Sequence, residues 1–596
     1  MPSWIEDYAL IGDCHTAGLI ARNGSIDWLC FPRFDGGACF ASLVGTEEHG
    51  HWQITPAAKP ERIERRYRED TLVLETEYHT ADGAVTLIDC MPPRGNVPDL
   101  VRVVVGRTGS VRMRMELIIR FDYGSIIPWV RRTEDGLRAV AGPETLILKT
   151  PVDLQNENFR TAADFTVRAG ERVPFVLMWH PSHEAAPEPV DAEETIAATD
   201  RWWREWSSRC IYKGRWRDAV IRSLITLKAL TYAPTGGIVA AATTSLPECL
   251  GGVRNWDYRY CWVRDATFTL YALLLGGYVE EACAWREWLL RAVAGQPSQL
   301  NIMYGIAGER RLTELELPWL PGYENSAPVR IGNAASQQFQ LDVYGELMDA
   351  MHVARRAGLE LNENAWRVEL ALTQFLESAW TEPDNGIWEI RGPKRHFTHS
   401  KVMAWVAIDR MIKAVERFGL EGPVDRWRTL RATIHDEVCH KGFDAERNSF
   451  VQHYGGQELD ASLLMIPLVG FLPAADPRVR GTVAAIEREL LTDGFVLRYR
   501  TRRDLEHLPP GEAAFLACSF WLADNYALLG RNEDAQRLFR QLLSLCNDVG
   551  LLSEGYDAGN KRLLGNFPQA LSHLSLVNTA FNLSRDRGPA ADRQQG

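Results

Sequence analysis

The sequence predicts a multidomain β + α protein, in which an antiparallel β-sandwich is followed by a linker helix and an (α/α)6 barrel. Three observations support this fold class: strand-like runs stop near residue 190, helical periodicity dominates afterwards, and the connections between the helices alternate between short and long. We divide the 596 residues into a β-domain (1–190), a linker helix (191–213), a barrel (214–585) and a tail (586–596). The tail is polar, and we expect it to be disordered.

The β-domain is predicted from short apolar runs that alternate or are rich in β-branched residues, with turn residues between them. The clearest runs are 71–80, 84–92, 100–107 and 111–122. Their spacing of about ten residues per strand favours two packed antiparallel sheets over a parallel sheet with helical crossovers.

The linker is predicted from residues 191–210, DAEETIAATDRWWREWSSRC. This segment is rich in helix formers and has acidic residues in its first turn, where they interact favourably with the helix dipole. We therefore expect a single helix between the two large parts of the chain.

The barrel is predicted from twelve periodic apolar stretches. The expected helices are 215–233, 265–276, 280–294, 337–357, 363–379, 399–418, 425–439, 460–470, 478–491, 512–529, 532–546 and 568–585. The links after the even-numbered helices are about 2–7 residues long, as between antiparallel neighbours, and the other links are about 19–42 residues long. If successive helices run up and down, all the long loops emerge at one end, as in an (α/α)6 barrel. The alternative is an irregular helical domain.

Charge and hydropathy exclude several classes of partner. The net charge is −12, and no long Lys/Arg run gives the electrostatic footprint of a nucleic-acid or membrane-surface protein. No apolar run approaches the roughly 18 residues of a membrane span. The N-terminus carries acidic residues where a secretory signal needs positive charge. We therefore expect a cytoplasmic protein with no nucleic-acid or membrane partner; the sequence leaves the oligomeric state open.

The long loops combine carboxylates, arginines and aromatic residues. Four of them stand out: 246–268, 383–401, 494–512 and 550–569. A sugar ring stacks its apolar face on indole or phenol rings, while its hydroxyl groups bind charged or planar polar side chains. This mixture predicts a small carbohydrate as the substrate.

Glu389 and Glu554 are the best candidates for a catalytic pair. Glycoside hydrolysis needs one protonated carboxyl group and one ionised carboxylate. Each of these glutamates is the lone carboxylate of a short aromatic-flanked segment, Ile-Trp-Glu-Ile and Ser-Glu-Gly-Tyr. The alternative for each is a solvated loop charge.

Other carboxylates are weaker candidates. Asp265 has the alternative role of capping its helix, and Asp384 lies in Pro-Asp-Asn-Gly, which is typical of a turn. Glu248 and Glu512 are plausible pocket residues without a distinguishing context.

No metal or cofactor is predicted. The pairs His396/His399 and His180/His183 have H-x-x-H spacing, but neither has a convincing third ligand. The sequence contains no phosphate-binding P-loop, no dinucleotide fingerprint and no G-x-S-x-G elbow.

Four blocks, 5–35, 254–268, 386–405 and 551–580, resemble glycoside hydrolase family 15. This glucoamylase-like family has bacterial members that include glucoamylases, glucodextranases and trehalases, and the resemblance covers nearly the whole chain. It implies a β-supersandwich, a linker helix and an (α/α)6 barrel whose loop end holds the pocket. It also implies hydrolysis with inversion of the anomeric configuration.

The resemblance assigns catalytic roles to three residues. Glu389, in the Trp-Glu motif, aligns with the general acid, and Glu554, in the Ser-Glu-x-Tyr-Asp motif, aligns with the general base. Tyr258 matches the tyrosine that helps to hold the attacking water. The family often has an acid or amide directly after the base, where this chain has Gly555.

The resemblance also implies the binding residues. In the Trp-x-Arg-Asp motif, Arg264 and Asp265 match the pair that grips the outer hydroxyls of the terminal glucosyl unit, with Trp262 beside them. Trp388 and Arg498 match further subsite residues.

The expected function is that of an inverting, exo-acting α-glucosidase that releases β-glucose from a non-reducing end. Trehalose is the favoured substrate, because the absence of a visible export signal fits a small intracellular sugar better than starch. The alternatives are maltose, isomaltose and longer α-glucans; a sugar phosphorylase and a non-catalytic carbohydrate-binding protein are further alternatives.

Overall fold

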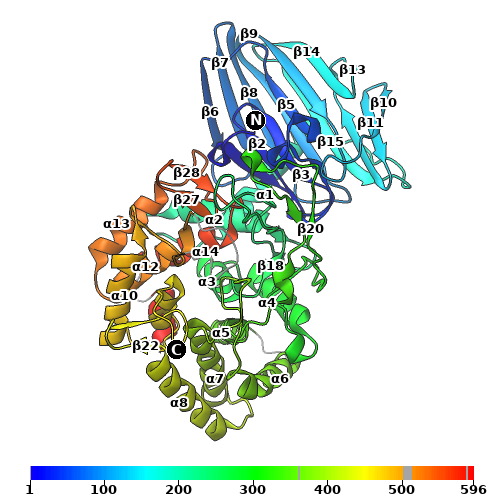
Figure 1. Ribbon diagram of the computed structural model, residues 1–596. Helices are drawn as coiled ribbons and strands as arrows, with labels where there is room; N and C mark the ends of the chain where they lie inside the picture. The colour runs from blue at the N-terminus through cyan, green and yellow to red at the C-terminus, as the bar shows by residue number, and fades with distance from the viewer. Residues whose placement is uncertain (1, 360–362, 501–512, 585–587, 596) are drawn as a thin grey trace.

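The computed structural model describes residues 2–359, 363–500, 513–584 and 588–595. Figure 1 shows two parts: an N-terminal lobe of strands, and a larger lobe in which helices are arranged around a common centre. One cluster of buried apolar side chains continues from the first part into the second. The two parts therefore share a packed interface.

The β-domain is a large antiparallel assembly arranged around β9 (Asp99–Ile118). The first half of β9 pairs with β8 (Gly83–Cys90) and β15 (Arg172–Pro181), and its second half pairs with β5 (His51–Pro56) and β14 (Arg160–Arg168). The remaining strands are β1 (Tyr8–Gly12), β2 (Ala17–Ala21), β3 (Ser25–Cys30), β4 (Ala38–Phe40), β6 (Arg62–Tyr67), β7 (Leu74–Thr80), β10 (Trp129–Thr133), β11 (Gly136–Ala141), β12 (Glu144–Lys149) and β13 (Gln155–Glu157). Strand β9 thus passes from one group of strands to the other.

The course of β9 corrects the sequence prediction. The sequence predicts two strands, at 100–107 and 111–122, but residues 99–118 form one strand. Gly106 and Gly109 lie at its midpoint, Gly109 has φ = +66°, and a Cβ at either position would lie 2.0 Å from a backbone oxygen. Glycine is needed there because a side chain would clash, and the same residues resemble a turn in the sequence.

Helix α1 (Ala192–Ser208) connects the two parts (Figure 1). Its N-terminus is capped by Asp191, whose carboxylate accepts a 2.8 Å hydrogen bond from the Glu194 amide. One face packs on β9 and β15. At the other end the Trp206 ring stacks on Tyr278 of the helical part, with the ring centroids 4.1 Å apart. The helix therefore fixes the β-domain against the helical part.

An observed helix overlaps each stretch that the sequence predicts to be helical. The helices are α2 (Arg217–Ala229), α3 (Ala266–Gly276), α4 (Val279–Val293), α5 (Asp342–Arg356), α6 (Glu363–Ala379), α7 (Thr398–Phe418), α8 (Val424–Lys441), α9 (Met465–Leu468), α10 (Pro477–Glu489), α12 (Leu516–Leu528), α13 (Asn532–Leu543) and α14 (Ala570–Ser584). Packing runs from α3 through α5, α7, α9, α12 and α14 and returns to α3. These helices form a closed inner ring.

The long loops precede the inner helices, so the residues they carry gather at one end of the ring. The segment with Arg264 and Asp265 leads into α3, Glu389 precedes α7, Arg498 precedes α12 and Glu554 precedes α14. Rigid helices thus hold the loops that carry the candidate residues.

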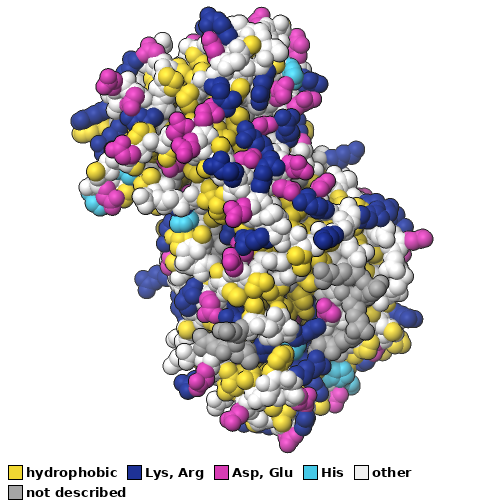
Figure 2. Space-filling view, turned by 180° about the vertical axis from the view of Figure 1, so that it is seen from behind, with side chains coloured by type: hydrophobic (Ala, Val, Ile, Leu, Met, Phe, Trp, Pro, Cys, Tyr) yellow, Lys and Arg dark blue, Asp and Glu magenta, His cyan; other side chains and the backbone are white. Residues whose placement is uncertain are grey.

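The face opposite to the view of Figure 1 mixes charges of both signs (Figure 2). Lys and Arg side chains alternate with Asp and Glu side chains over both parts of the molecule, without one continuous patch of a single sign. Within the described residues, none of the helices is both long enough and apolar enough to cross a bilayer.

The C-terminal tail differs from its prediction. In place of disorder, residues 589–595 form α15 (Pro589–Gln595), and the Arg593 side chain is only 4% exposed. Arg593 Nη2 lies 2.5 Å from Asp349 Oδ2 on α5, and Arg410 donates to the other oxygen of the same carboxylate. The polar composition of the tail cannot reveal this partner, which lies more than 200 residues away in the sequence.

We expect Arg593→Ala to lower the free energy of unfolding by about 2 kcal/mol, because a buried carboxylate loses one of its two charged partners. Urea unfolding followed by circular dichroism measures this loss. The control is Arg356→Ala, whose Nη2 lies 3.9 Å from Asp592 with both side chains 34% exposed; it should cost less than about 0.5 kcal/mol. Equal losses would contradict a special role for the buried pair.

Candidate active site

A pocket lies where the long loops meet. Its walls are Glu248, Arg254, Trp256, Tyr258, Arg264, Asn333, Ala335, Trp388, Glu389, Ile390, Arg391, Arg498, Tyr499 and Phe515. Six residues named from the sequence are in this wall: Glu248, Tyr258, Arg264, Trp388, Glu389 and Arg498. Trp262, Asp265 and Glu554 are not in the wall, but each is hydrogen-bonded to a wall residue.

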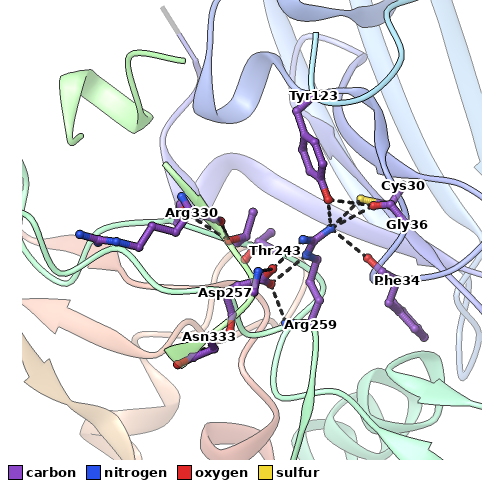
Figure 3. Close-up of polar contacts among 12 residues, drawn as sticks. Cys30, Phe34, Gly36, Tyr123, Thr243, Asp257, Arg259, Arg330 and Asn333 are labelled. Atoms are coloured by element: carbon purple, nitrogen blue, oxygen red, sulfur yellow. Dashed lines mark hydrogen bonds and ion pairs between the residues drawn. The ribbon is translucent and has the colours of Figure 1, made fainter. Parts of the chain in front are cut away.

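The β-domain anchors the loop that carries Tyr258. Arg259 is buried; its guanidinium donates to the Asp257 carboxylate, to the Tyr123 hydroxyl at 2.8 Å and to the Gly36 carbonyl at 3.1 Å (Figure 3). Aromatic and charged side chains alternate over residues 256–259. Trp256 and Tyr258 line the pocket. Arg259 bonds to the β-domain, and the Asp257 carboxylate accepts from Arg259 and, at 3.1 Å, from the Gly332 amide. Sequence reasoning missed this anchor, although the alternation itself was a visible signal.

Glu554 is buried directly before β27 (Gly555–Asp557), next to the pocket wall. Its carboxylate accepts a 2.7 Å hydrogen bond from the Tyr258 hydroxyl and a 3.3 Å hydrogen bond from the Asn566 amide. Burial raises the pKa of Glu554, and the Arg498 charge and the Tyr258 hydrogen bond offset part of that rise. These donors favour the ionised form, which is the form that a base needs.

Glu389 stands in a tight turn on the pocket wall. Its backbone is left-handed, with φ = +58°, and its amide donates to the Gly386 carbonyl at 3.1 Å. A non-glycine residue held in this region is strained, and such strain is typical of functional sites. The carboxylate accepts a 2.7 Å hydrogen bond from Trp262 Nε1, and Arg264 Nη1 lies 3.7 Å away. Burial raises the pKa of Glu389, with Arg264 and then Trp262 acting against that rise.

The two glutamates are connected by an aromatic pair. Tyr258 donates to Glu554, Trp262 donates to Glu389, and the two rings contact edge to face with centroids 5.1 Å apart. Residues 165 positions apart in the sequence, by 554 − 389, thus belong to one site. The alternative that each glutamate is a solvated loop charge is wrong, because Glu554 is 3% exposed, the Glu389 side chain is only 19% exposed, and each carboxylate accepts a hydrogen bond from an aromatic side chain of this site.

Asp265 does not cap its helix. It occupies the N-cap position of α3, but its side chain accepts no capping hydrogen bond there. Instead its Oδ1 accepts a 2.8 Å hydrogen bond from Arg264 Nε, and the residue is 6% exposed. The pair forms a fixed acceptor and donor set at the N-terminus of α3.

Asp384 supports the site from inside the fold. The turn interpretation is wrong, because the residue is buried and its backbone forms an isolated β-bridge with Arg395. Its carboxylate accepts a 2.9 Å hydrogen bond from the Leu341 amide at the start of α5. Burial raises its pKa to about 6. Asp342, the first residue of α5, is also buried, and its pKa is raised to about 7 by burial and by the neighbouring Asp384 charge.

Trp388 and Arg498 are neighbours in the pocket wall. Trp388 Nε1 donates to Asp460 at 2.8 Å, and the Arg498 guanidinium lies 5.8 Å from the centre of the Trp388 ring. Arg498 Nη2 also donates to Glu248 at 2.6 Å. Glu248 has no distinguishing context in the sequence, and no motif singles out Asp460. Each is tied to the site by a partner 72 residues or more away.

Glu512 lies outside the described residues. Across the described ranges, no group of three or more His, Cys, Asp or Glu residues is arranged to hold a metal ion.

Comparison with known proteins identifies the family of this chain. The model of glycosyl hydrolases family 15 matches residues 214–581, and that of a trehalase-like N-terminal domain matches residues 1–203. The chain belongs to glycosyl hydrolases family 15. The family resemblance read from the sequence motifs is therefore confirmed, and the protein is a glycoside hydrolase.

The similarity extends over nearly the full length of the relatives. The trehalase of Mycobacterium tuberculosis is 37% identical, with 98% of this chain and 90% of the relative covered. The trehalase of Thermoplasma acidophilum is 35% identical, with 95% and 98% covered. A bacterial glucoamylase solved with acarbose superposes with a TM-score of 0.73 at 12% identity, covering 98% and 94% of the two chains. This match confirms the fold at the level of a large antiparallel β-domain followed by a helical part.

Proposed function

We propose that this family 15 glycoside hydrolase is an inverting, exo-acting α-glucosidase whose substrate is trehalose. The observation that carries the proposal is the pair of glutamates at one pocket, each of which accepts a hydrogen bond from its own aromatic donor. The near-full-length similarity to proteins named trehalase supports trehalose over maltose, isomaltose and longer α-glucans.

The architecture proposed for this function is a β-supersandwich joined by a linker helix to an (α/α)6 barrel. The closed inner ring from α3 to α14 supports it, because the other helices pack outside that ring. In this arrangement the loop end of the barrel, where the N-termini of the inner helices lie, holds the substrate.

The terminal glucosyl unit would bind at Arg264 and Asp265, in the interior of the pocket. Arg264 and Asp265 offer donors and acceptors in fixed positions to its outer hydroxyl groups. Trp262 lies beside this pair, and Trp388 and Arg498 line the same pocket. The apolar ring face and the polar hydroxyl groups of the sugar each find a matching surface.

The chemistry divides between the two glutamates. Glu389 donates its proton to the glycosidic oxygen, the bond from this oxygen to the anomeric carbon breaks, and an oxocarbenium-like state forms. Glu554, assisted by Tyr258, takes a proton from water as the water oxygen bonds to the opposite face of the anomeric carbon. β-Glucose leaves, and the proton passes from Glu554 back to Glu389 through solvent.

The test of this function is proton NMR of the protein with trehalose in phosphate-free buffer, recorded before mutarotation. Inversion at one anomeric centre gives equal early signals of α-glucose, from the leaving unit, and β-glucose, from the attacked unit. Early α-glucose alone would contradict inversion. Hydrolysis of maltose or isomaltose with no hydrolysis of trehalose would replace the substrate, and glucose 1-phosphate formed only after phosphate addition would indicate a phosphorylase.

A further inference from the structure

The pocket mouth carries a stacked pair that the proposed mechanism does not use. The Arg391 guanidinium carbon lies 3.9 Å from the centre of the Trp256 ring, and both side chains line the pocket. At this distance the guanidinium lies against the indole ring, and this contact stabilises the positions of both side chains.

Glu314 fixes the orientation of Arg391. Arg391 Nη1 donates to one Glu314 oxygen at 3.1 Å, and Nη2 donates to the other at 2.7 Å. A bidentate pair of this kind sets the plane of the guanidinium as well as its position. Glu314 lies outside the pocket wall, so it acts on the pocket only through Arg391 and its neighbours.

Trp256 is held just as firmly. A second guanidinium, that of Arg330 on β21 (Arg330–Ile331), lies 4.7 Å from the centre of the Trp256 ring. The Trp256 carbonyl accepts a 3.0 Å hydrogen bond from the Asn566 side chain, and the Asn566 amide donates to Glu554. The stack is therefore built into the same framework as the base.

The position of the Arg391–Trp256 pair indicates that it contacts the departing sugar. Arg391 follows Glu389 by two residues, and its side chain is 31% exposed against 12% for Arg264. An exo-acting enzyme places the terminal sugar deepest, against Arg264, so the departing sugar faces the entrance. The acid that protonates the bond between the two sugars lies 3.7 Å from Arg264, and the charges of Arg264 and Arg391 both act on it.

We propose that Arg391, held flat on Trp256 by Glu314, forms the wall of the second-sugar subsite and determines the specificity for a disaccharide leaving group. This inference rests on the proposed α-glucosidase function and adds the recognition of the second sugar. The ligand is an unmodified glucosyl unit, whose hydroxyl groups accept from the remaining guanidinium N–H and pack against a rigid plane.

The test compares trehalose with α-glucosyl fluoride, which has the same first sugar but no second one. Glu314→Gln should lower the ratio of kcat/KM for trehalose to that for α-glucosyl fluoride about tenfold, mainly through a higher KM for trehalose. Arg391→Lys keeps the charge but loses the plane and the bidentate pair, and it should lower the same ratio further.

The control is Glu382→Gln. Glu382 is an exposed residue on the loop that carries Arg391, nine positions before it, by 391 − 382. Its side chain forms no hydrogen bond or ion pair with Arg391, Arg330 or Trp256 among the described residues, so the ratio should not change.

Two outcomes separate this inference from the proposed function. If the wild-type protein hydrolyses neither trehalose nor α-glucosyl fluoride, the proposed function fails. If the wild-type protein hydrolyses both, while Glu314→Gln and Arg391→Lys reduce the two activities by the same factor at unchanged thermal stability, the second-sugar subsite is elsewhere and the inference is overturned.

Discussion

Glu389→Gln should lower kcat for trehalose by about 10²- to 10⁴-fold, the range that a positioned general acid supplies. The amide retains the shape of the side chain and can still contact Trp262 Nε1, but it has no proton to give to the departing sugar. The loss should be much smaller with α-glucosyl fluoride, because fluoride leaves without protonation. Steady-state kinetics with both substrates measure the difference.

The matched control for this substitution is Glu382→Gln, an exposed glutamate seven positions before Glu389, by 389 − 382, on the same loop. It should leave both activities unchanged. A Glu389→Gln protein with near-wild-type turnover of trehalose would remove Glu389 from the role of acid.

The pH profile supplies an independent check on the same residue. Burial raises the pKa of Glu389, so its protonated, active form persists to higher pH than that of an exposed glutamate. We expect activity on trehalose to fall on the alkaline side as this group loses its proton. In Glu389→Gln, the residual hydrolysis of α-glucosyl fluoride should lack that alkaline decline.

The helical architecture and the two glutamates could be predicted because local information determines them. Each helix carries its own apolar periodicity, and the alternation of short and long loops requires the long loops to share an end. Glu389 and Glu554 follow from short motifs in those loops, and the structure joins them through Tyr258 and Trp262. Motif residues remain recognisable without knowledge of the fold.

The supporting residues could not be predicted, because their roles depend on distant partners. Asp460 acts through Trp388, and Glu248 acts through Arg498, 250 residues away. The anchoring of Arg259 to Gly36 and Tyr123 requires the β-domain and the helical part to be docked already. No periodicity or spacing in a single sequence encodes such contacts.

The two structural corrections have the same origin. The sequence of β9 resembles two strands because glycine marks both a turn and a bend, and only the pairing with β8 and β14 distinguishes them. The tail resembles a disordered segment because its polar residues outnumber its apolar ones. The ion pair between Arg593 and the buried Asp349 carboxylate nevertheless holds the tail against α5.

Glu554→Ala should lower kcat for trehalose by about 10²- to 10⁴-fold, because the attacking water loses its base. Protonation of the leaving group by Glu389 is unaffected, so the defect lies on the nucleophile side. The shortened side chain leaves space beside Tyr258, and a small anion that needs no deprotonation can use it. We therefore expect azide to restore turnover of α-glucosyl fluoride and to give β-glucosyl azide, which NMR identifies.

Azide should have no such effect on Glu389→Gln. This variant keeps Glu554 as its base, and the glutamine side chain leaves no space for azide at the position of the acid. This contrast assigns the two glutamates to opposite faces of the sugar, an assignment that their separate aromatic partners already favour. Formation of α-glucosyl azide, or equal rescue of both variants, would show that the water does not approach from the Glu554 side. The inverting mechanism would then need a different base.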